Sequence, residues 1–252
     1  MRILVVNPNT TASMTEKIGV AARAAVSPGT EVVAVNPSMG PVSIEGYYDE
    51  AFALPGLLEE IARGEREGFD AHVIACFDDT GLDAARALAR GPVLGICEAG
   101  LHLASMLGGR CAIVTTLSRS VPALEGLARR YGMAERTHVT AAEVPVLALE
   151  DPSSGAEAKV RETIRRAIAT HGADTVLLGC AGMADLARRL ADDVGLPVID
   201  GVSAAARLAE SLVALGLRTS KVGGYASPLA KPYLGMLAPF APSGDDHKEA
   251  AR

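Results

Sequence analysis

Residues 71–82 read Ala71-His72-Val73-Ile74-Ala75-Cys76-Phe77-Asp78-Asp79-Thr80-Gly81-Leu82, and this stretch decides how the rest of the chain is interpreted. It begins as an apolar run, which is typical of a buried strand, and it ends in a cysteine, a turn and the start of a helical pattern. The same order returns as Thr175-Val176-Leu177-Leu178-Gly179-Cys180-Ala181-Gly182-Met183-Ala184-Asp185-Leu186. In both copies a leucine lies six positions after the cysteine, and a second short apolar run follows the helical pattern. The repeat predicts two similar halves with one cysteine at the same point of each.

The composition excludes several classes of protein. Of the 252 residues 49% are hydrophobic, only 4% are aromatic and none is Trp, which favours a core of Ala, Val and Leu where helices pack on parallel strands. A formal net charge of −6 with mixed signs argues against a nucleic-acid partner. No apolar run approaches the ~18 residues that a membrane span needs, and the N-terminus has no signal-peptide core. We therefore expect a cytoplasmic protein with no membrane partner.

Metal and cofactor motifs are also missing. The four cysteines are widely spaced and form no CxxC pair, which argues against a disulfide framework and against a zinc site. The chain has no GxGxxG, P-loop or HExxH motif, and its five histidines do not cluster. We expect a site that works without a metal and without a cofactor.

Short apolar runs and amphipathic stretches alternate along the chain. Besides the two runs that end at the repeated cysteines, the runs that predict strands are residues 3–6, 32–35, 93–96, 111–115, 143–147 and 196–200. The stretches that predict helices are residues 14–25, 51–66, 81–89, 99–107, 120–131, 156–170 and 203–215. Thr11 or Ser13 is expected to cap the first helix, and residues 39–48, which follow neither period, are expected to form a long loop.

This alternation, with a four-strand pattern that occurs twice, predicts an α/β fold. We expect two lobes related by a pseudo-twofold axis, each a mostly parallel sheet of about four strands flanked by helices. Residues 1–97 and 205–240 are assigned to lobe 1, residues 98–204 to lobe 2, and residues 241–252 to a disordered tail. In parallel sheets ligands bind beyond the carboxyl ends of the strands. Both repeated cysteines lie at such ends, so we expect them to face each other across an interlobe cleft, with the active site between them.

The two cysteines point to proton transfer at carbon. Where a strand feeds a helix, backbone N–H groups and the helix dipole favour a thiolate, so we expect lowered thiol pKa values at Cys76 and Cys180. A thiolate on one face of a substrate and a thiol on the other form a two-base pair that removes a proton and returns one to the opposite face. The expected reaction is racemisation or epimerisation, with the carbanion stabilised by the substrate carbonyl and by backbone donors.

The alternative is that these cysteines are inert packing residues, which buried cysteines often are. Their matched positions in a repeat argue against that alternative for Cys76 and Cys180, but not for Cys97 and Cys111, which have no matched partner. The acids after Cys76 oppose a low thiol pKa, because nearby negative charge disfavours a thiolate. Asp79 is expected to cap the helix that follows it, and its alternative role is to accept hydrogen bonds from substrate N–H groups.

These phrases also resemble a known family. Together with Asn7-Pro8-Asn9-Thr10, Val42-Ser43-Ile44-Glu45-Gly46 and Pro197-Val198-Ile199-Asp200-Gly201, they resemble the aspartate/glutamate/hydantoin racemase superfamily from Arg2 to about Tyr225. Within it the chain is most similar to hydantoin racemases and allantoin racemases. The resemblance implies cofactor-independent racemisation by two cysteines, a final helix that returns to the first lobe, and a homo-oligomer.

The departures from the family pattern bear on the substrate. Amino-acid racemases of the superfamily carry Asp where Asn7 stands, and they follow the cysteines with polar pairs where this chain has Phe77-Asp78 and Ala181-Gly182. Those polar groups help with an α-proton next to a carboxylate, and a hydantoin ring has no carboxylate. The resemblance therefore implies a racemase of 5-monosubstituted hydantoins, with allantoin as the alternative small-molecule substrate. An aspartate/glutamate-type racemase and a non-catalytic ligand-binding module are less favoured.

By the same resemblance, ten residues are expected to contact the substrate. They come from the ends of expected strands and from the loops that follow them: Asn7, Asn9, Ser43, Ile44, Phe77, Asp79, Thr115, Thr116, Gly182 and Met183.

Overall fold

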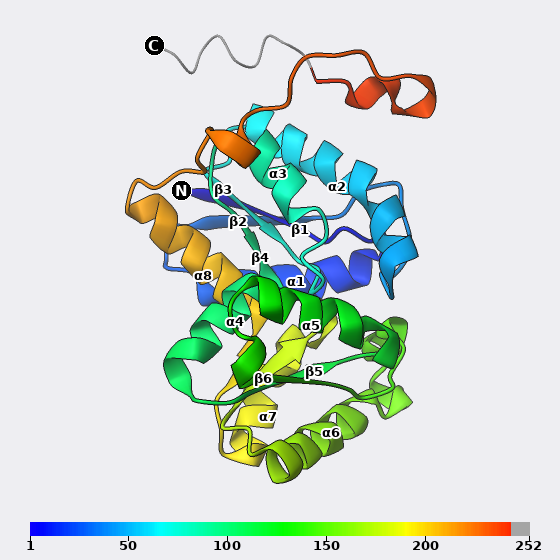
Figure 1. Ribbon diagram of the computed structural model, residues 1–252, viewed down its shortest axis with the longest axis vertical. Helices are drawn as coiled ribbons and strands as arrows, with labels where there is room; N and C mark the ends of the chain where they lie inside the picture. Colours follow the sequence, from blue (N-terminus) through cyan, green and yellow to red (C-terminus); the bar gives the residue numbers. More distant parts are fainter. Residues whose placement is uncertain (243–252) are drawn as a thin grey trace.

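The computed structural model describes residues 1–242, and it contains two four-stranded parallel sheets (Figure 1). The first sheet has the order β2-β1-β3-β4 and the second the order β6-β5-β7-β8. The strands are β1 (Arg2–Val6), β2 (Glu31–Val35), β3 (Ala71–Ile74), β4 (Val93–Gly95), β5 (Cys111–Thr115), β6 (Thr137–Ala141), β7 (Thr175–Gly179) and β8 (Val198–Asp200). The same strand order in both sheets confirms the predicted α/β fold with two similar halves.

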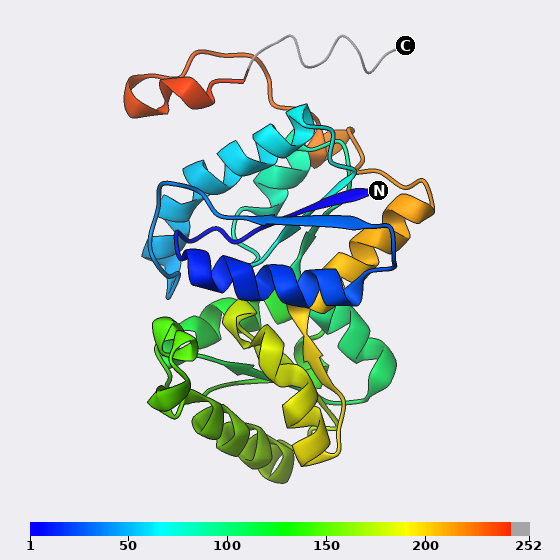
Figure 2. The same ribbon diagram turned by 180° about the vertical axis from the view of Figure 1, so that it is seen from behind.

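Helices connect the strands, as a parallel sheet requires. The α-helices are α1 (Ala12–Ala25), α2 (Tyr47–Arg66), α3 (Leu82–Leu88), α4 (Ile96–Leu107), α5 (Val121–Arg130), α6 (Ala156–His171), α7 (Ala187–Val194) and α8 (Gly201–Ala214). In Figures 1 and 2 the half that contains β1–β4 lies above the half that contains β5–β8, and α1 and α4 lie where the two meet. Helix α8 follows the last strand of the second sheet and packs against α1, α4 and β3 of the first half.

One apolar core runs through both halves. It includes Ile3 from the first sheet and Leu177 from the second, and the small residues of α8 are buried between them. The chain approaches itself closely at Gly201, where an added Cβ atom would lie 2.4 Å from the backbone oxygen of Ile96. Only glycine allows α8 and α4 to begin this close together.

The predicted strand at residues 143–147 is wrong. The strand of this region is β6, which pairs with β5 in the register Cys111↔Thr137 to Thr115↔Ala141. The apolar residues around Pro145 form no strand. The N–H of Val144 donates to the backbone oxygen of Thr116, and a short 3-10 helix, Val146–Glu150, follows. β6 alternates Thr, His, Val and Thr at the edge of its sheet, a pattern with few apolar residues.

Four helices begin earlier than predicted: α1 at Ala12, α2 at Tyr47, α4 at Ile96 and α8 at Gly201. Helix α2 begins at Tyr47 rather than near residue 51, because the Asp49 carboxylate in its first turn accepts the N–H of Glu45 at 3.0 Å. The predicted loop therefore ends at Gly46. Thr11 stands at the N-terminus of α1, as predicted, but its hydroxyl donates to the oxygen of Val42 at 2.6 Å and does not cap the helix. The side chain of Asn9 accepts the Thr11 N–H instead, at 2.9 Å.

Helix α4 also begins early, at Ile96, because Asp79 caps it. The carboxylate oxygens of Asp79 accept the N–H groups of Cys97 at 3.0 Å and of Glu98 at 2.9 Å, and the hydroxyl of Tyr131 donates to one of them at 2.7 Å. The prediction that Asp79 caps the helix following it in sequence is wrong, since Gly81 occupies that position. Asp79 instead binds the start of α4 and the end of α5, which are distant in sequence.

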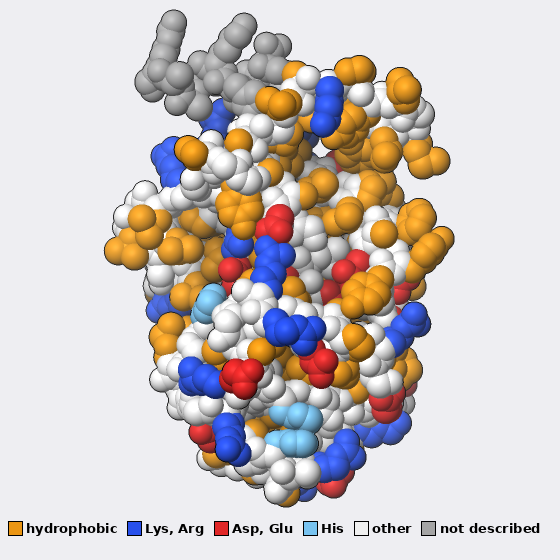
Figure 3. Space-filling model, viewed as in Figure 1, with side chains coloured by type: hydrophobic (Ala, Val, Ile, Leu, Met, Phe, Trp, Pro, Cys, Tyr) orange, Lys and Arg blue, Asp and Glu red, His pale blue; other side chains and the backbone are white. Residues whose placement is uncertain are grey.

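Beyond α8 the chain runs along the outside of the first half (Figures 1 and 2). Figure 3 shows hydrophobic side chains gathered over this segment and over α2, among them the exposed Leu234 and Met236. Within residues 1–242 no helix combines the length and the apolar character that crossing a membrane requires. The predicted disordered tail lies, from residue 243 onward, outside the described residues.

We predict that Asp79→Ala lowers the free energy of unfolding by about 1–3 kcal/mol, because it leaves the buried N–H groups of Cys97 and Glu98 without an acceptor. Urea denaturation followed by circular dichroism measures the change. Asp192→Ala, at an exposed position of α7, is the control and should change the value by less than about 0.5 kcal/mol. Equal stability of both variants would contradict the capping role.

Candidate active site

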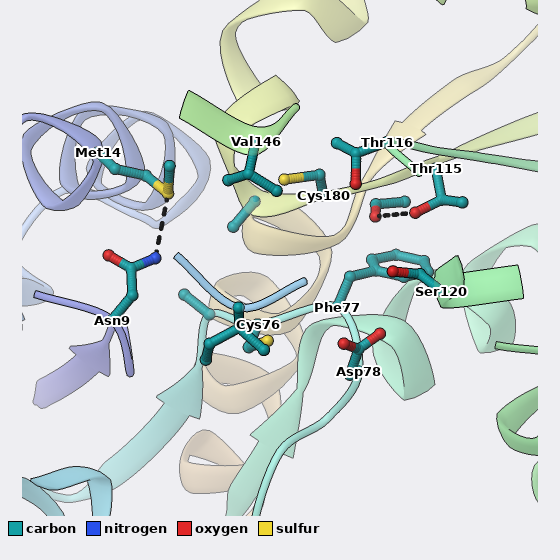
Figure 4. Close-up of a pocket in the computed structure, with 14 residues that line it drawn as sticks. Asn9, Met14, Cys76, Phe77, Asp78, Thr115, Thr116, Ser120, Val146 and Cys180 are labelled. Carbon is teal, nitrogen blue, oxygen red and sulfur yellow. Dashed lines mark hydrogen bonds between the residues drawn. The ribbon is translucent and has the colours of Figure 1, made fainter. Parts of the chain in front are cut away.

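A pocket lies at the carboxyl ends of both sheets, and residues from both halves line it (Figure 4). It contains about 420 Å³ of empty space, including the part that opens to solvent. Its lining residues are Asn9, Met14, Ile44, Ala75, Cys76, Phe77, Asp78, Thr115, Thr116, Ser120, Val146, Gly179, Cys180 and Ala181. In Figure 4 the side chains of Cys76 and Cys180 lie on opposite sides of the pocket.

Cys76 leaves the first sheet directly after β3. The N–H of Ala75 still bonds to the oxygen of Val6 at 2.8 Å, and from Cys76 onward the chain turns into the pocket. The Thr80 hydroxyl donates to the sulfur of Cys76 at 3.3 Å, and the backbone N–H of Asp78 also bonds to it. These two donors favour the thiolate form of Cys76.

Cys180 follows β7 in the same way. Gly179 allows the strands to pack tightly, because an added Cβ would lie 2.9 Å from the Cα of Thr115. The Thr115 hydroxyl donates to the oxygen of Gly179 at 3.1 Å and fixes this end of the strand. The backbone N–H of Gly182 bonds to the sulfur of Cys180, in the first turn of a 3-10 helix, Ala181–Leu186.

The expectation of lowered thiol pKa values is wrong for the structure without ligand. Burial raises the pKa of Cys180 to about 12, and burial followed by the charge of Asp78 raises the pKa of Cys76 well above its ordinary value. The helix argument fails because neither cysteine begins an α-helix: α3 starts six residues after Cys76, and a 3-10 helix follows Cys180. Both thiols are protonated at rest, and the neighbouring donors offset only part of the desolvation.

Asp78 is the one acidic side chain in the lining, and its position gives the pocket a negative character. Burial, and then the charges of Glu50 and Asp79, raise its pKa to about 7. Within the described chain no Lys or Arg side chain lines the pocket. An anionic ligand therefore meets no countercharge here, and a neutral ligand suits the site better.

No three His, Cys, Asp or Glu side chains of residues 1–242 converge where a metal ion could bind.

The structure brings together five of the ten predicted contact residues. These line the pocket with the two cysteines: Asn9, Ile44, Phe77, Thr115 and Thr116. The other five do not line it: Asn7, Ser43, Asp79, Gly182 and Met183.

Each of four residues outside the lining has another place in the fold. The amide of Asn7 donates to the side-chain oxygen of Asn9 at 2.9 Å and so orients a pocket residue. The backbone N–H of Gly182 bonds to the sulfur of Cys180. Asp79 caps α4, and Met183 is fully buried in the core of the second half.

Four side chains that line the pocket were not predicted from the sequence. Met14 and Ser120 lie at the starts of the helices that follow β1 and β5, and Asp78 follows Cys76. Val146 comes from the loop after β6, just as Ile44 comes from the loop after β2. The repeat could have predicted Val146 as the counterpart of Ile44. The strand wrongly predicted at residues 143–147 prevented this.

Two contacts join the halves beside the pocket. The carboxylate of Glu45 accepts the N–H of Val146 at 3.0 Å, which links the loop after β2 to the loop after β6. The ammonium group of Lys17 donates to the oxygen of Leu149 at 3.0 Å and pairs with Glu150 at 3.1 Å. These contacts fix the loops that bring Ile44 and Val146 into the pocket lining.

Comparison with known proteins gives consistent matches over nearly the whole chain. The family model described as Asp/Glu/Hydantoin racemase matches residues 3–209. A hydantoin racemase of Pseudomonas sp. (strain NS671) is 48% identical over 242 residues, covering 95% of this chain and 97% of that protein. A hydantoin racemase of Rhizobium meliloti is 49% identical, with 93% and 98% covered. The solved structure of an allantoin racemase from Klebsiella pneumoniae has a TM-score of 0.93 and 51% identity, with 96% and 100% covered.

We predict that iodoacetamide alkylates Cys76 more slowly than it alkylates glutathione at pH 8.5, because the pKa of the buried thiol is raised. Asp78→Asn removes a negative charge and lowers that pKa, so Cys76 should react about threefold to tenfold faster than in the unmodified protein. Peptide mass mapping over time gives the rate at each cysteine, and Asp192→Asn is the charge-matched control. A slower reaction in Asp78→Asn would contradict the electrostatic account.

Proposed function

The chain belongs to the Asp/Glu/hydantoin racemase family, and on this premise we propose that it racemises 5-monosubstituted hydantoins by proton transfer between Cys76 and Cys180 at C5 of the ring. One observation carries this proposal: two thiols from equivalent points of the two halves face one small pocket from opposite sides. A flat ring between them presents one face of C5 to each sulfur.

The protonation states of the two thiols follow from their burial. Both thiols are protonated at rest, so the active form has lost one proton and holds one thiolate and one thiol. The thiolate removes the C5 proton from its face, the other thiol donates to the opposite face, and the product leaves with the two sulfurs in exchanged states. The N–H groups of Asp78 and Gly182 stabilise whichever sulfur is charged.

The carbanion at C5 needs hydrogen-bond donors for the carbonyl oxygen that takes up its charge. The hydroxyl of Thr115 is engaged with Gly179, but the hydroxyls of Thr116 and Ser120 also lie in the lining. We assign these two hydroxyls to the ring oxygen. Donors placed in advance in a site with little water are worth more than the same donors in bulk solvent.

The charge of the pocket favours a neutral ring over an amino acid. An α-carboxylate would lie near Asp78 and would have no Lys or Arg partner in the described lining. A hydantoin carries no carboxylate, and its C5 carbanion delocalises into the adjacent carbonyl. The polar residues at one end of the pocket favour allantoin as the second candidate substrate, and a non-catalytic binding module would not need two facing thiols.

We also propose that the protein is a cytoplasmic homo-oligomer that needs no cofactor. The thiols supply both the base and the acid, so the chemistry calls for no further group. The segment after α8 exposes Val222, Leu234 and Met236 by 82%, 86% and 89%, and apolar surface of this kind favours association with a second copy.

A polarimetric assay of the purified protein tests the function directly. We predict racemisation of 5-substituted hydantoins from either enantiomer and none of L-aspartate or L-glutamate, because the pocket has no cation for their carboxylates. Activity on the amino acids without activity on any hydantoin would overturn the proposed substrate class.

Replacement of either cysteine by Ser removes an effective base, since a hydroxyl loses its proton only far above neutral pH. We predict that Cys76→Ser and Cys180→Ser each lower racemisation in both directions by ~10²–10⁴-fold. In D₂O the remaining thiolate can still exchange the proton of its own face, so each variant should label one enantiomer with retention, and the two variants should label opposite enantiomers. Cys97→Ser is the control. Near-normal racemisation by either pocket variant, or labelling of the same enantiomer by both, would contradict the two-base mechanism.

A further inference from the structure

The chain beyond α8 carries an apolar segment, residues 226–242, which we call the arm. It contains four prolines and a single charged residue, Lys231. Leu229, Leu234 and Met236 in the arm are exposed by 81%, 86% and 89%. Segments that stay solvated are typically rich in charge and poor in apolar residues, and the arm has the opposite composition. Its side chains therefore call for a covering surface.

The arm is held at its root and free along its length. The ammonium group of Lys221 donates to the backbone oxygen of Arg86 at 2.6 Å, and the hydroxyl of Tyr225 donates to the carboxylate of Asp83 at 3.0 Å. Among residues 1–242, no hydrogen bond or ion pair ties residues 229–242 to an α-helix or a strand. Figures 1 and 2 both show the arm extending outward beyond α2. The root thus directs the arm away from its own chain.

A second apolar surface lies on α2. Its first two turns expose Tyr47, Tyr48 and Phe52, which we call the aromatic patch, and the rings of Tyr48 and Phe52 lie 4.8 Å apart between centroids. A surface helix normally presents polar residues to solvent, and exposed aromatic residues are typical of interfaces. Figure 3 shows hydrophobic side chains over α2 and over the arm on one face of the molecule. Within one chain neither surface covers the other, since both stay exposed.

The charges favour contact between an arm and a patch. Residues 47–60 of α2 contain no Lys or Arg, and they carry four acids: Asp49, Glu50, Glu59 and Glu60. The arm contains no acid, and its one charge, on Lys231, is positive. Attraction between opposite charges favours an arm on a patch, whereas two arms or two patches would bring like charges together.

Two reciprocal contacts supply the area that a stable dimer needs. A buried Leu or Met removes ~60–120 Å² from water and a fully buried aromatic side chain roughly 150–250 Å². Covering Leu229, Leu234, Met236 and the aromatic patch therefore buries roughly 500–850 Å² on each copy, against about 800 Å² per partner in a standard interface. The prolines of the arm restrict its backbone, which reduces the entropy lost on docking.

We propose that the arm of one copy docks on the aromatic patch of a second copy and that the second arm returns the contact, so that two chains exchange arms about a twofold axis. This inference rests on the homo-oligomer of the proposed function and adds the two surfaces that form it. Tyr47 follows Ile44 by three residues, so the partner's arm lies beside a loop that lines the pocket.

Sedimentation equilibrium of the full chain tests both surfaces. We compare the unmodified protein with Leu234→Glu/Met236→Glu in the arm, with Tyr48→Glu/Phe52→Glu in the patch, and with the control Leu215→Glu at an exposed position just after α8. Each double variant should raise the Kd of dimerisation by ~10²-fold or more, because docking would bury unpaired carboxylates, and the control should leave it unchanged. A monomeric unmodified protein, double variants that associate normally, or a control that dissociates equally overturns the proposal.

Cross-linking separates exchange between chains from a contact within one chain. Chains with Leu234→Cys are mixed with chains with Phe52→Cys at low concentration, so that copies exchange, and are treated with a bismaleimide. We expect a covalent pair with one chain of each kind, joined between an arm peptide and an α2 peptide, and none when Leu215→Cys replaces Leu234→Cys. The unmodified protein gives the background from the native cysteines. Linkage found only within a chain that carries both changes overturns the exchange, since the arm then folds back on its own α2.

Polarimetry on the same samples keeps this proposal apart from the proposed function. Racemisation of hydantoins by a protein that stays monomeric overturns the arm exchange alone. A protein that exchanges arms but racemises no hydantoin overturns the proposed function alone.

Discussion

The hydrogen bonds that the N–H groups at the start of α4 donate to the carboxylate of Asp79 hold the site together. Asp79 lies three residues after Cys76, α4 packs where the two halves meet, and Tyr131 approaches from the end of α5. One buried carboxylate thus fixes the loop that carries a pocket cysteine relative to both halves. Because its acceptors are saturated by fixed donors, the loop has one well-defined conformation, and the position of Cys76 follows from it.

Burial acts in two opposite ways on the chemistry. It raises the pKa of both thiols, so the thiolate that the proposed reaction requires is scarce. The same exclusion of water would strengthen the hydrogen bonds that we propose between a ring oxygen and the hydroxyls of Thr116 and Ser120. Burial also raises the pKa of Asp78 to about 7, so the same effect acts on the acid beside Cys76.

The alternation of short apolar runs with helical stretches, together with the repeated cysteine phrase, was sufficient to predict two parallel sheets of about four strands, because buried parallel strands are short apolar runs. It also indicated which side chains lie just beyond the carboxyl ends of the strands. The errors concern residues whose partners are distant in sequence. Edge strand β6 has too few apolar residues to be recognised, Asp79 caps a helix 17 residues further along the chain, and the thiol pKa values depend on burial in the folded protein. No local pattern encodes such contacts.

The close contact between Gly201 and Ile96 restricts how the molecule can move. With α8 and α4 joined at their starts and one core shared across the halves, a hinge that swings the halves apart would break the best-packed part of the protein. Entry to the pocket is then left to the loops around Ile44 and Val146, which are held by a few polar contacts. Segments held by few contacts open at lower cost than a packed core, so we expect small molecules to exchange through these loops while the packing between α8 and α4 stays intact.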